Sequence, residues 1–326
     1  MKLPHRRQFL HLVAGAAALP VVSRVARAQA YPARPVRIIS PFGTAGANDL
    51  VARLIGQWLS ERFGQQFVIE NRPGAGGTIG TEAAVRAPAD GYTLLLVGAY
   101  NAIDATLYDK LSFDFIRDIA PVAPIIRLAN VLDVNLSVPA KTVPEFIAYA
   151  KANPGKINMA SVGTGSTPHV TGELFKMMAG VNMVHVPYRS AGAALTDLIS
   201  GQVQVYFGTT ASSIEHIKAG KIRALGVTTT ARAEALPDVP TIAEFVPGYE
   251  ASNWYGVGIP KNTPAEIIEQ LNKEVNAALD DPKMKAHLAD LGGTVLAGSP
   301  ADFGKMIAEE TEKWGKVIRA LNIKAD

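Results

Sequence analysis

Short apolar runs rich in β-branched residues alternate along the chain with segments in which apolar residues recur every three or four positions. The runs are typical of buried strands and predict strands at 36–39, 67–70, 93–97, 157–161, 183–186, 203–207 and 224–228. Helical spacing is clearest at Leu50, Val51, Leu54, Ile55, Trp58 and Leu59, and further helices are expected at 143–153, 170–179, 191–200 and 300–321. Strands separated by helices predict an α/β fold with parallel-rich sheets covered on both faces.

The alternation changes character at two places, which predicts two lobes. Near 130–138 an extended apolar segment leads into a new series of strands and helices, and near 250–259 that series ends. A long helix is then expected, with Thr263 as its N-cap and Pro264 at its first position. Two crossings indicate a split first lobe, 31–131 plus 254–326, with a second lobe, 132–253, inserted into it.

Two glycine-rich turns stand where an expected strand passes into a helix. The first turn (41–49) reads Pro-Phe-Gly-Thr-Ala-Gly-Ala-Asn-Asp, and the second turn (161–169) reads Ser-Val-Gly-Thr-Gly-Ser-Thr-Pro-His. A helix N-terminus attracts anions because its first N–H groups lack partners and its dipole is positive. In separate lobes, the two turns would form facing cradles for a small acid. Helix capping by the hydroxyls is the alternative for the second turn.

The first thirty residues predict an export signal, 1–30, that is removed. Lys2, Arg6 and Arg7 precede the apolar stretch 9–22, and small residues near 26–30 suit a cleavage site. The Arg6-Arg7 pair resembles a twin-arginine signal, and an ordinary secretory signal is the alternative. The stretch is shorter than the ~20 apolar residues that a membrane-spanning helix needs.

Removal of this segment changes the sign of the net charge. The chain has 32 basic and 29 acidic residues, and five of the basic residues but none of the acidic ones lie in 1–30, which leaves 27 against 29. The expected mature protein therefore lacks a basic excess for nucleic acid or anionic lipid. Since the chain has no cysteine, disulfides and thiolate metal sites are excluded.

The motifs of common enzyme classes are missing from the sequence. No histidines show the H-E-x-x-H spacing, residues 163–167 lack the G-x-S-x-G order, and no G-K-[ST] phosphate loop occurs. In 74–80, Ile79 stands where a dinucleotide fingerprint needs its third glycine. We therefore expect no catalytic residue, metal or cofactor, and a periplasmic enzyme acting on a small organic acid is the weaker alternative.

Five sequence blocks carry a resemblance to a known family. They are 69–80 (Ile-Glu-Asn-Arg-Pro-Gly-Ala-Gly-Gly-Thr-Ile-Gly), 89–95 (Ala-Asp-Gly-Tyr-Thr-Leu-Leu), 161–169, 186–189 (Val-Pro-Tyr-Arg) and 236–241 (Leu-Pro-Asp-Val-Pro-Thr). In this order they resemble the Bug family, the periplasmic solute-binding proteins of tripartite tricarboxylate transporters, from about Pro35 to the C-terminal helix. The resemblance implies a two-lobed periplasmic binding protein fold of type II-like topology, with two parallel-rich sheets joined by two crossover segments. It also implies a monomer that passes a small carboxylate to small and large integral-membrane subunits.

In this family a ligand carboxylate is held between the loops of the two lobes, largely by backbone amides. Carried onto this chain, the resemblance gives the ligand-binding residues Phe42, Thr44, Ala45, Gly46, Ala47, Asn48, Asp49, Gly77, Thr78, Tyr100, Thr164, Gly165, Ser166, Thr167, His169, Tyr188, Arg189, Ser190, Ala191, Phe207 and Gly208. Residues 253–255 are candidates for the floor of the cleft or for the core. For His169, at a first helical turn, capping or packing is favoured over catalysis.

The sequence departs from the family pattern in the expected loops. Thr44-Ala45 stand where proline and glycine are usual, Ser190 stands where a glycine is common, and Gly208 stands where many relatives place aspartate. If that aspartate faces a ligand ammonium group, its absence argues against an amino-acid ligand. The expected cargo is a mono-, di- or tricarboxylate, aromatic acids included. A periplasmic sensor that presents its ligand to a signalling receptor would use the same cleft and remains an alternative.

Overall fold

The computed structural model describes residues 31–108, 110–321 and 323–324, so the expected export signal lies outside them. The strands are β1 (Val36–Ser40), β2 (Phe67–Asn71), β3 (Thr93–Gly98), β4 (Ile119–Val134), β5 (Asn158–Ser161), β6 (Val184–Pro187), β7 (Val205–Thr209), β8 (Arg223–Val227), β9 (Ser252–Pro260) and β10 (Gly293–Val295). The helices are α1 (Ala47–Phe63), α2 (Thr78–Val85), α3 (Ala99–Leu107), α4 (Phe115–Asp118), α5 (Val143–Ala152), α6 (Thr167–Ala179), α7 (Ala191–Ser200), α8 (Thr210–Lys218), α9 (Ala265–Asp280), α10 (Pro282–Asp290) and α11 (Pro300–Leu321), with short 3₁₀ turns η1 (Ala75–Gly77) and η2 (Ile242–Glu244). The expected strands and helices are confirmed, with small shifts at their ends.

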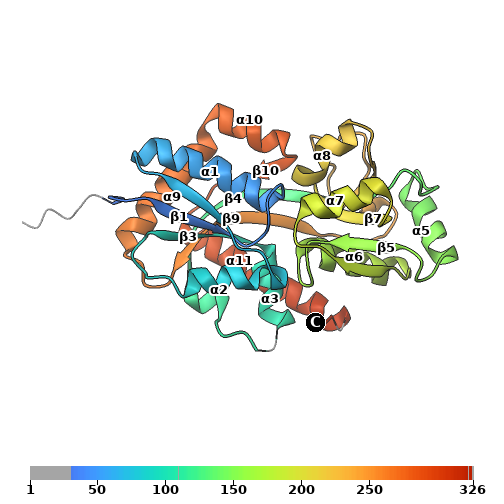
Figure 1. Cartoon of the computed structure of the whole chain (residues 1–326), viewed down its shortest axis with the longest axis horizontal. Helices are drawn as coiled ribbons and strands as arrows, with labels where there is room; N and C mark the ends of the chain where they lie inside the picture. Colours follow the sequence, from blue (N-terminus) through green and yellow to red (C-terminus); the bar gives the residue numbers. More distant parts are fainter. Residues whose placement is uncertain (1–30, 109, 322, 325–326) are drawn as a thin grey trace, which may run out of the picture.

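The strands form two groups that share β4 (Figure 1). In the first group β1 pairs in parallel with β2 and β3, and β9 runs antiparallel to β3 and β4. In the second group β5 pairs in parallel with β6 and β7, while β7 and β8 run antiparallel to β4. The predicted α/β class is confirmed. We keep the names first lobe and second lobe for the predicted units, whose limits remain a prediction.

Strand β4 is the longest strand in the described chain, and it connects the two groups. Residues 119–129 pair with β9, and residues 130–134 pair with β7. The sequence indicated only its second half, because Pro121 and Pro124 are disfavoured inside strands. The pairing with β9 shifts register next to both prolines, and such bulges tolerate a residue that cannot donate to the ladder.

Helices cover both faces of the first-lobe strands, as Figure 1 shows for α1 and α9 above them and α11 below. One apolar cluster joins β1 to α1 and α9 through Val51, Ile55 and Leu271, which are at most 1% exposed. Another joins β3 to α3 and α11 and includes Ile103 and Trp314. The packing therefore fixes where α1 begins relative to the sheet.

One helix start differs from its prediction. Helix α9 begins at Ala265 with Pro264 as its N-cap residue, not Thr263. The Thr263 hydroxyl donates instead to the Pro260 carbonyl at 2.7 Å. It therefore closes the turn after β9 and is not available to cap the helix.

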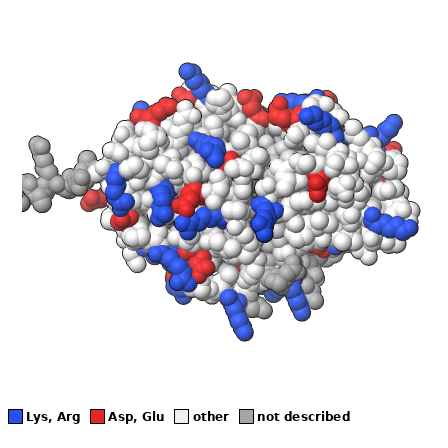
Figure 2. Space-filling model, in the orientation of Figure 1, with Lys and Arg blue, Asp and Glu red and all other residues white. Residues whose placement is uncertain are grey.

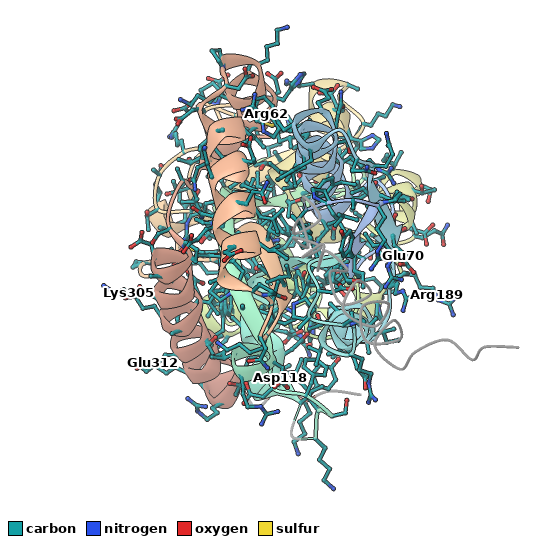
Figure 3. The ribbon with its side chains drawn as sticks, turned by 90° about the vertical axis from the view of Figure 1, so that its left-hand side faces the viewer. Arg62, Glu70, Asp118, Arg189, Lys305 and Glu312 are labelled. Carbon is teal, nitrogen blue, oxygen red and sulfur yellow. The ribbon has the colours of Figure 1, made fainter. Side chains whose placement is uncertain are left out.

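Charged side chains of both signs are scattered over the face in Figure 2, without a large patch of one sign. Figure 3 shows Lys305 and Glu312 projecting outward from α11. Within the described ranges no helix combines the length and apolar character needed to cross a membrane.

Candidate functional site

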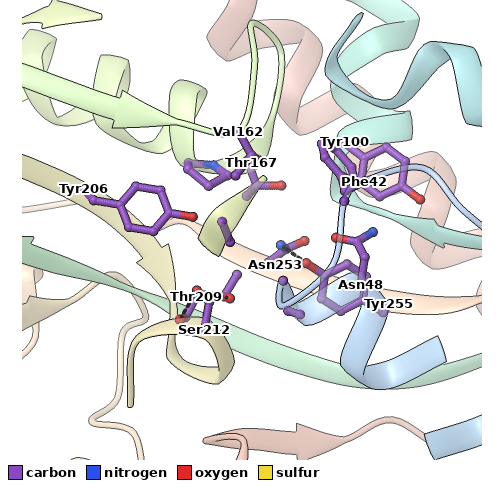
Figure 4. A pocket seen from close by; sticks show the side chains of 15 residues that line it. Phe42, Asn48, Tyr100, Val162, Thr167, Tyr206, Thr209, Ser212, Asn253 and Tyr255 are labelled. Atoms are coloured by element: carbon purple, nitrogen blue, oxygen red, sulfur yellow. Dashed lines mark hydrogen bonds between the residues drawn. The ribbon is translucent and has the colours of Figure 1, made fainter. Parts of the chain in front are cut away.

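A cavity lies between the two groups of strands (Figure 4). Its wall consists of Phe42, Gly43, Gly46, Ala47, Asn48, Tyr100, Val162, Thr167, Pro168, Ala191, Tyr206, Thr209, Ser212, Asn253 and Tyr255. The wall thus takes in the first residues of α1, α6 and α7 and the N-cap of α8. Four helix N-termini converge on one small space.

None of the 15 wall residues carries a charged side chain. Each helix N-terminus is equivalent to roughly half a positive charge and leaves backbone N–H groups without intrahelical partners. Four such ends offer about two positive charges in total, without the desolvation cost of burying a lysine or arginine. The cavity therefore suits an anion with one or two acidic groups.

Three tyrosines line the cavity, and their hydroxyl groups remain neutral. Burial raises the pKa of Tyr100, Tyr206 and Tyr255 above the ordinary value of 10.0, so all three remain protonated. The Tyr100 hydroxyl donates to the Leu96 carbonyl, and the Tyr255 hydroxyl accepts from Asn253 Nδ2 at 2.6 Å. Of the three, Tyr206 directs its hydroxyl toward the middle of the cavity (Figure 4).

Asn48 lines the opposite wall. It lies in the first turn of α1 and is 6% exposed. Its side chain interacts with the Tyr100 hydroxyl and so opposes part of the rise that burial causes in the Tyr100 pKa. Its amide oxygen points toward the cavity (Figure 4).

Close glycine contacts bring loops of the two lobes together around the cavity. A Cβ atom on Gly76 would lie 2.4 Å from the Thr164 carbonyl oxygen, and one on Gly43 would lie 2.9 Å from Ser190 Cβ. A Cβ on Gly165 would lie 3.0 Å from Asp104 Oδ1. Larger residues at these positions would hold the two sides apart, so the glycines permit the closed arrangement seen here.

Seven predicted site residues lie in the cavity wall: Phe42, Gly46, Ala47, Asn48, Tyr100, Thr167 and Ala191. Their ligand-binding role remains a prediction. Phe42 and Tyr100 also pack edge to face, with ring centroids 4.9 Å apart, so one aromatic pair forms a side of the cavity.

The other predicted site residues lie off the wall; they are Thr44, Ala45, Asp49, Gly77, Thr78, Thr164, Gly165, Ser166, His169, Tyr188, Arg189, Ser190, Phe207 and Gly208. Thr44 and Ala45 are exposed at the tip of the first turn, and Arg189 projects from the surface (Figure 3). The hydroxyls of Ser166 and Tyr188 donate within the second lobe, to the Gly163 carbonyl at 2.6 Å and to Asp197 at 2.7 Å. These side chains stabilise the loops that carry the wall.

Local packing also explains the remaining positions away from the cavity. His169 is 5% exposed, its Nδ1 accepts from the Gly165 N–H at 3.2 Å, and its ring stacks on His185. Ser190 is the N-cap of α7 and accepts from the Ala193 N–H at 3.2 Å. Gly77 packs against the Phe42 and Tyr100 rings, and Phe207 is buried in the core.

Two acids near the turns have opposite environments. Burial alone would raise the pKa of Asp49, but hydrogen bonds from Arg53 and Asn71 lower it overall. Arg53 Nη2 lies 2.9 Å from Asp49 Oδ1. Asp104 is 3% exposed and has no hydrogen-bond partner among the described residues, and burial raises its pKa well above the ordinary value. Asp49 is therefore held as an anion, and Asp104 favours the neutral acid.

The sequence did not indicate the wall residues Tyr206 and Ser212, whereas Val162 belongs to the second turn (161–169) but not to the expected ligand-binding residues. Ser212 stands three residues after Thr209, and the two hydroxyls lie 3.0 Å apart. Asn253 and Tyr255 were candidates for the floor and do line the cavity. Across the described ranges no group of three or more acidic, histidine or cysteine side chains is arranged to hold a metal ion.

Comparisons with known proteins agree with this architecture. The family model for the "Tripartite tricarboxylate transporter family receptor" matches residues 51–323. BugT of Bordetella pertussis is 35% identical over 300 residues, covering 91% of this chain and 92% of BugT. R. palustris Rpa4515, solved with adipate, is 38% identical with a TM-score of 0.88, and the match covers 90% of this chain and 99% of that one. MatC from Rhodopseudomonas palustris, solved with bound malate, is 30% identical with a TM-score of 0.84, and the match covers 88% and 100%.

Proposed function

The chain belongs to the family of tripartite tricarboxylate transporter receptors, and on that premise we propose that it captures a small carboxylate between its lobes and delivers it to the membrane subunits of such a transporter. The resemblance found in the sequence is confirmed. In this proposal the protein is exported to the periplasm, acts as a monomer and catalyses no reaction.

The observation that carries the proposal is the charge-free cavity at four helix N-termini. A carboxylate placed there meets backbone N–H groups and the positive ends of helix dipoles, which is how many proteins hold small anions. The Tyr206 hydroxyl adds a neutral donor. Adipate in Rpa4515 and malate in MatC are both dicarboxylates, which supports an acid of this size here.

Closure of the lobes is the proposed signal to the membrane subunits. Loops from both lobes contribute to the wall, so a ligand contacts both only when the lobes are together. Binding then shifts the population toward the closed form by the difference in affinity between the two forms. The glycine contacts at Gly43, Gly76 and Gly165 let the loops approach closely enough.

A thermal-shift screen followed by calorimetry tests the proposal. We expect at least one of adipate, malate, citrate and benzoate to raise the melting temperature, by about 5 °C at a hundredfold excess over Kd, because the acid binds only the folded state. Putrescine, a cation of similar size, is the control and should cause no shift. A screen in which none of the acids stabilises the protein, or in which putrescine does so equally, would contradict the proposal.

A further inference from the structure

Tyr206 and Gly208 form an unusual pair on strand β7. They are two residues apart and therefore point to the same face of the strand. A Cβ atom on Gly208 would lie 2.4 Å from Tyr206 Cε1 and 2.7 Å from Tyr206 Cδ1. The same atom would lie 2.5 Å from Ser213 Oγ. The tyrosine ring thus occupies the space that any larger residue at 208 would fill.

The position of the ring decides where its hydroxyl lies. The ring follows the strand toward the end at which α8 begins, and its oxygen points into the cavity near Thr209 and Ser212 (Figure 4). Tyr206 is 1% exposed, so almost none of its side chain is in contact with bulk water. It remains a donor at physiological pH because burial raises its pKa above the ordinary value.

This end of the cavity contains hydroxyl groups and no counter-ion. Thr209, Ser212 and Tyr206 face Asn48 and the start of α1 across the cavity (Figure 4). Asp133 on β4, the register partner of Tyr206, is fully buried, does not line the cavity, and favours its neutral form because burial raises its pKa. An ammonium group at this end would therefore lose its water without gaining an anionic partner.

We propose that Tyr206, held in place over Gly208, is a specificity-determining residue that selects the second end of the ligand. Its hydroxyl donates to an oxygen of a second acidic group, while the first carboxylate lies at the start of α1. Ligands with an apolar second end lose this hydrogen bond, and ligands with an ammonium second end are rejected. The inference rests on the proposed function, since it assigns a role within the same cavity.

The test uses two series of ligands that differ only at one end. The first series is adipate, hexanoate and 6-aminohexanoate, and the second is succinate, butanoate and 4-aminobutanoate. Calorimetry measures each ligand with the wild type and with Tyr206→Phe, which removes only the hydroxyl. Tyr249→Phe is the matched control, because Tyr249 is also buried and its hydroxyl donates to the Thr171 carbonyl at 2.9 Å outside the cavity.

We expect the wild type to bind the diacid of at least one series about tenfold or more tightly than its monoacid, and to bind neither amino acid. Tyr206→Phe should reduce the diacid-to-monoacid ratio about tenfold, with the monoacid affinity changed less than about twofold. Gly208→Ala should reduce the ratio similarly by displacing the ring. Tyr249→Phe should leave the ratio unchanged, and melting curves check that each variant is folded.

The outcomes separate the inference from the proposed function. A wild type that binds diacids, with a ratio that Tyr206→Phe does not change, overturns the role of Tyr206 and leaves carboxylate binding intact. Equal binding of adipate and 6-aminohexanoate overturns the rejection of ammonium groups. If the wild type binds no carboxylate in either these series or the earlier screen, the proposed function fails and the inference fails with it.

Discussion

The first turn (41–49) and the second turn (161–169) share the same sequence signal but have different structural environments. In the first turn, Phe42, Gly43 and residues 46–48 all reach the cavity wall. In the second turn, residues 163–166 lie off the wall, and only Val162, Thr167 and Pro168 reach it. A glycine- and hydroxyl-rich strand-to-helix turn can therefore either line a cavity along most of its length or serve mainly as a contact between lobes.

The difference follows from what lies opposite each turn. The middle of the second turn faces first-lobe backbone and side chains, with Gly76 against the Thr164 carbonyl and Asp104 against Gly165. Glycine is needed there for close approach of two chain segments. The first turn instead contributes Phe42, Gly43 and residues 46–48 to the cavity wall, where α1 begins.

The largest expected effect comes from blocking the lobe contact. Gly76→Ala would place its Cβ 2.4 Å from the Thr164 oxygen in the closed form. Relieving such an overlap costs about 1–3 kcal/mol, so we expect carboxylate affinity to fall about ten- to hundredfold. Calorimetry with the best ligand from the screen measures the change.

Gly64→Ala is the matched control for this change. Gly64 and Gly76 both have φ near +65°, but a Cβ on Gly64 would meet nothing within 4 Å. Both variants should lose about 1 kcal/mol of stability from backbone strain, and only Gly76→Ala should lose affinity. Equal affinity of the two variants would show that the second turn is not a lobe contact in solution.

A smaller effect should distinguish adjacent residues of the second turn. The Thr167 side chain lies in the cavity wall, whereas the Ser166 hydroxyl donates to the Gly163 carbonyl at 2.6 Å. We expect Thr167→Ala to weaken carboxylate binding about tenfold, and Ser166→Ala to cost about 1 kcal/mol of stability without changing affinity. Calorimetry measures the affinity and chemical denaturation measures the stability. A loss of affinity in Ser166→Ala would show that the middle of the second turn does contribute to ligand binding.

The smallest effect is a difference in the pH dependence of stability near the two turns. The pKa of Asp104 is higher in the folded protein than the ordinary value of 3.8. As pH rises above 3.8, Asp104 therefore loses its proton more readily in the unfolded protein than in the folded one, and this lowers the stability of the fold. Asp49 has a lowered pKa, so it contributes stability above 3.8 that is lost as pH falls through the lowered value. The stability of Asp104→Asn relative to the wild type should therefore be greater at pH 7 than at pH 4.

Asp49→Asn should show the opposite trend. It should lose about 0.5 kcal/mol at pH 7, a small amount because the Arg53 side chain is 53% exposed, and this loss should fade toward pH 3. Melting temperatures of both variants and the wild type between pH 3 and 8 measure the two trends. Parallel curves for Asp104→Asn and the wild type would mean that Asp104 is charged in the folded protein.

Local sequence patterns were sufficient for most of the fold and for part of the site. The strand and helix positions follow from apolar periodicity. The first turn was predicted to belong to the site because its glycines directly precede a helix N-terminus. The first half of β4 was missed because its prolines are tolerated only at bulges, which depend on the register with β9. Tyr206 was missed because it lies inside a strand, where an aromatic residue indicates core packing.

The sequence by itself determined the alternation of elements, the family and the presence of two helix starts suited to an anion. These are local properties, set by side-chain periodicity and by residues adjacent in the chain. Only the tertiary structure decided which helix starts meet, which glycines let the lobes approach closely and which tyrosine hydroxyl enters the cavity. Those outcomes depend on distances between segments far apart in sequence, such as Gly76 and Thr164, and on side-chain directions fixed by packing.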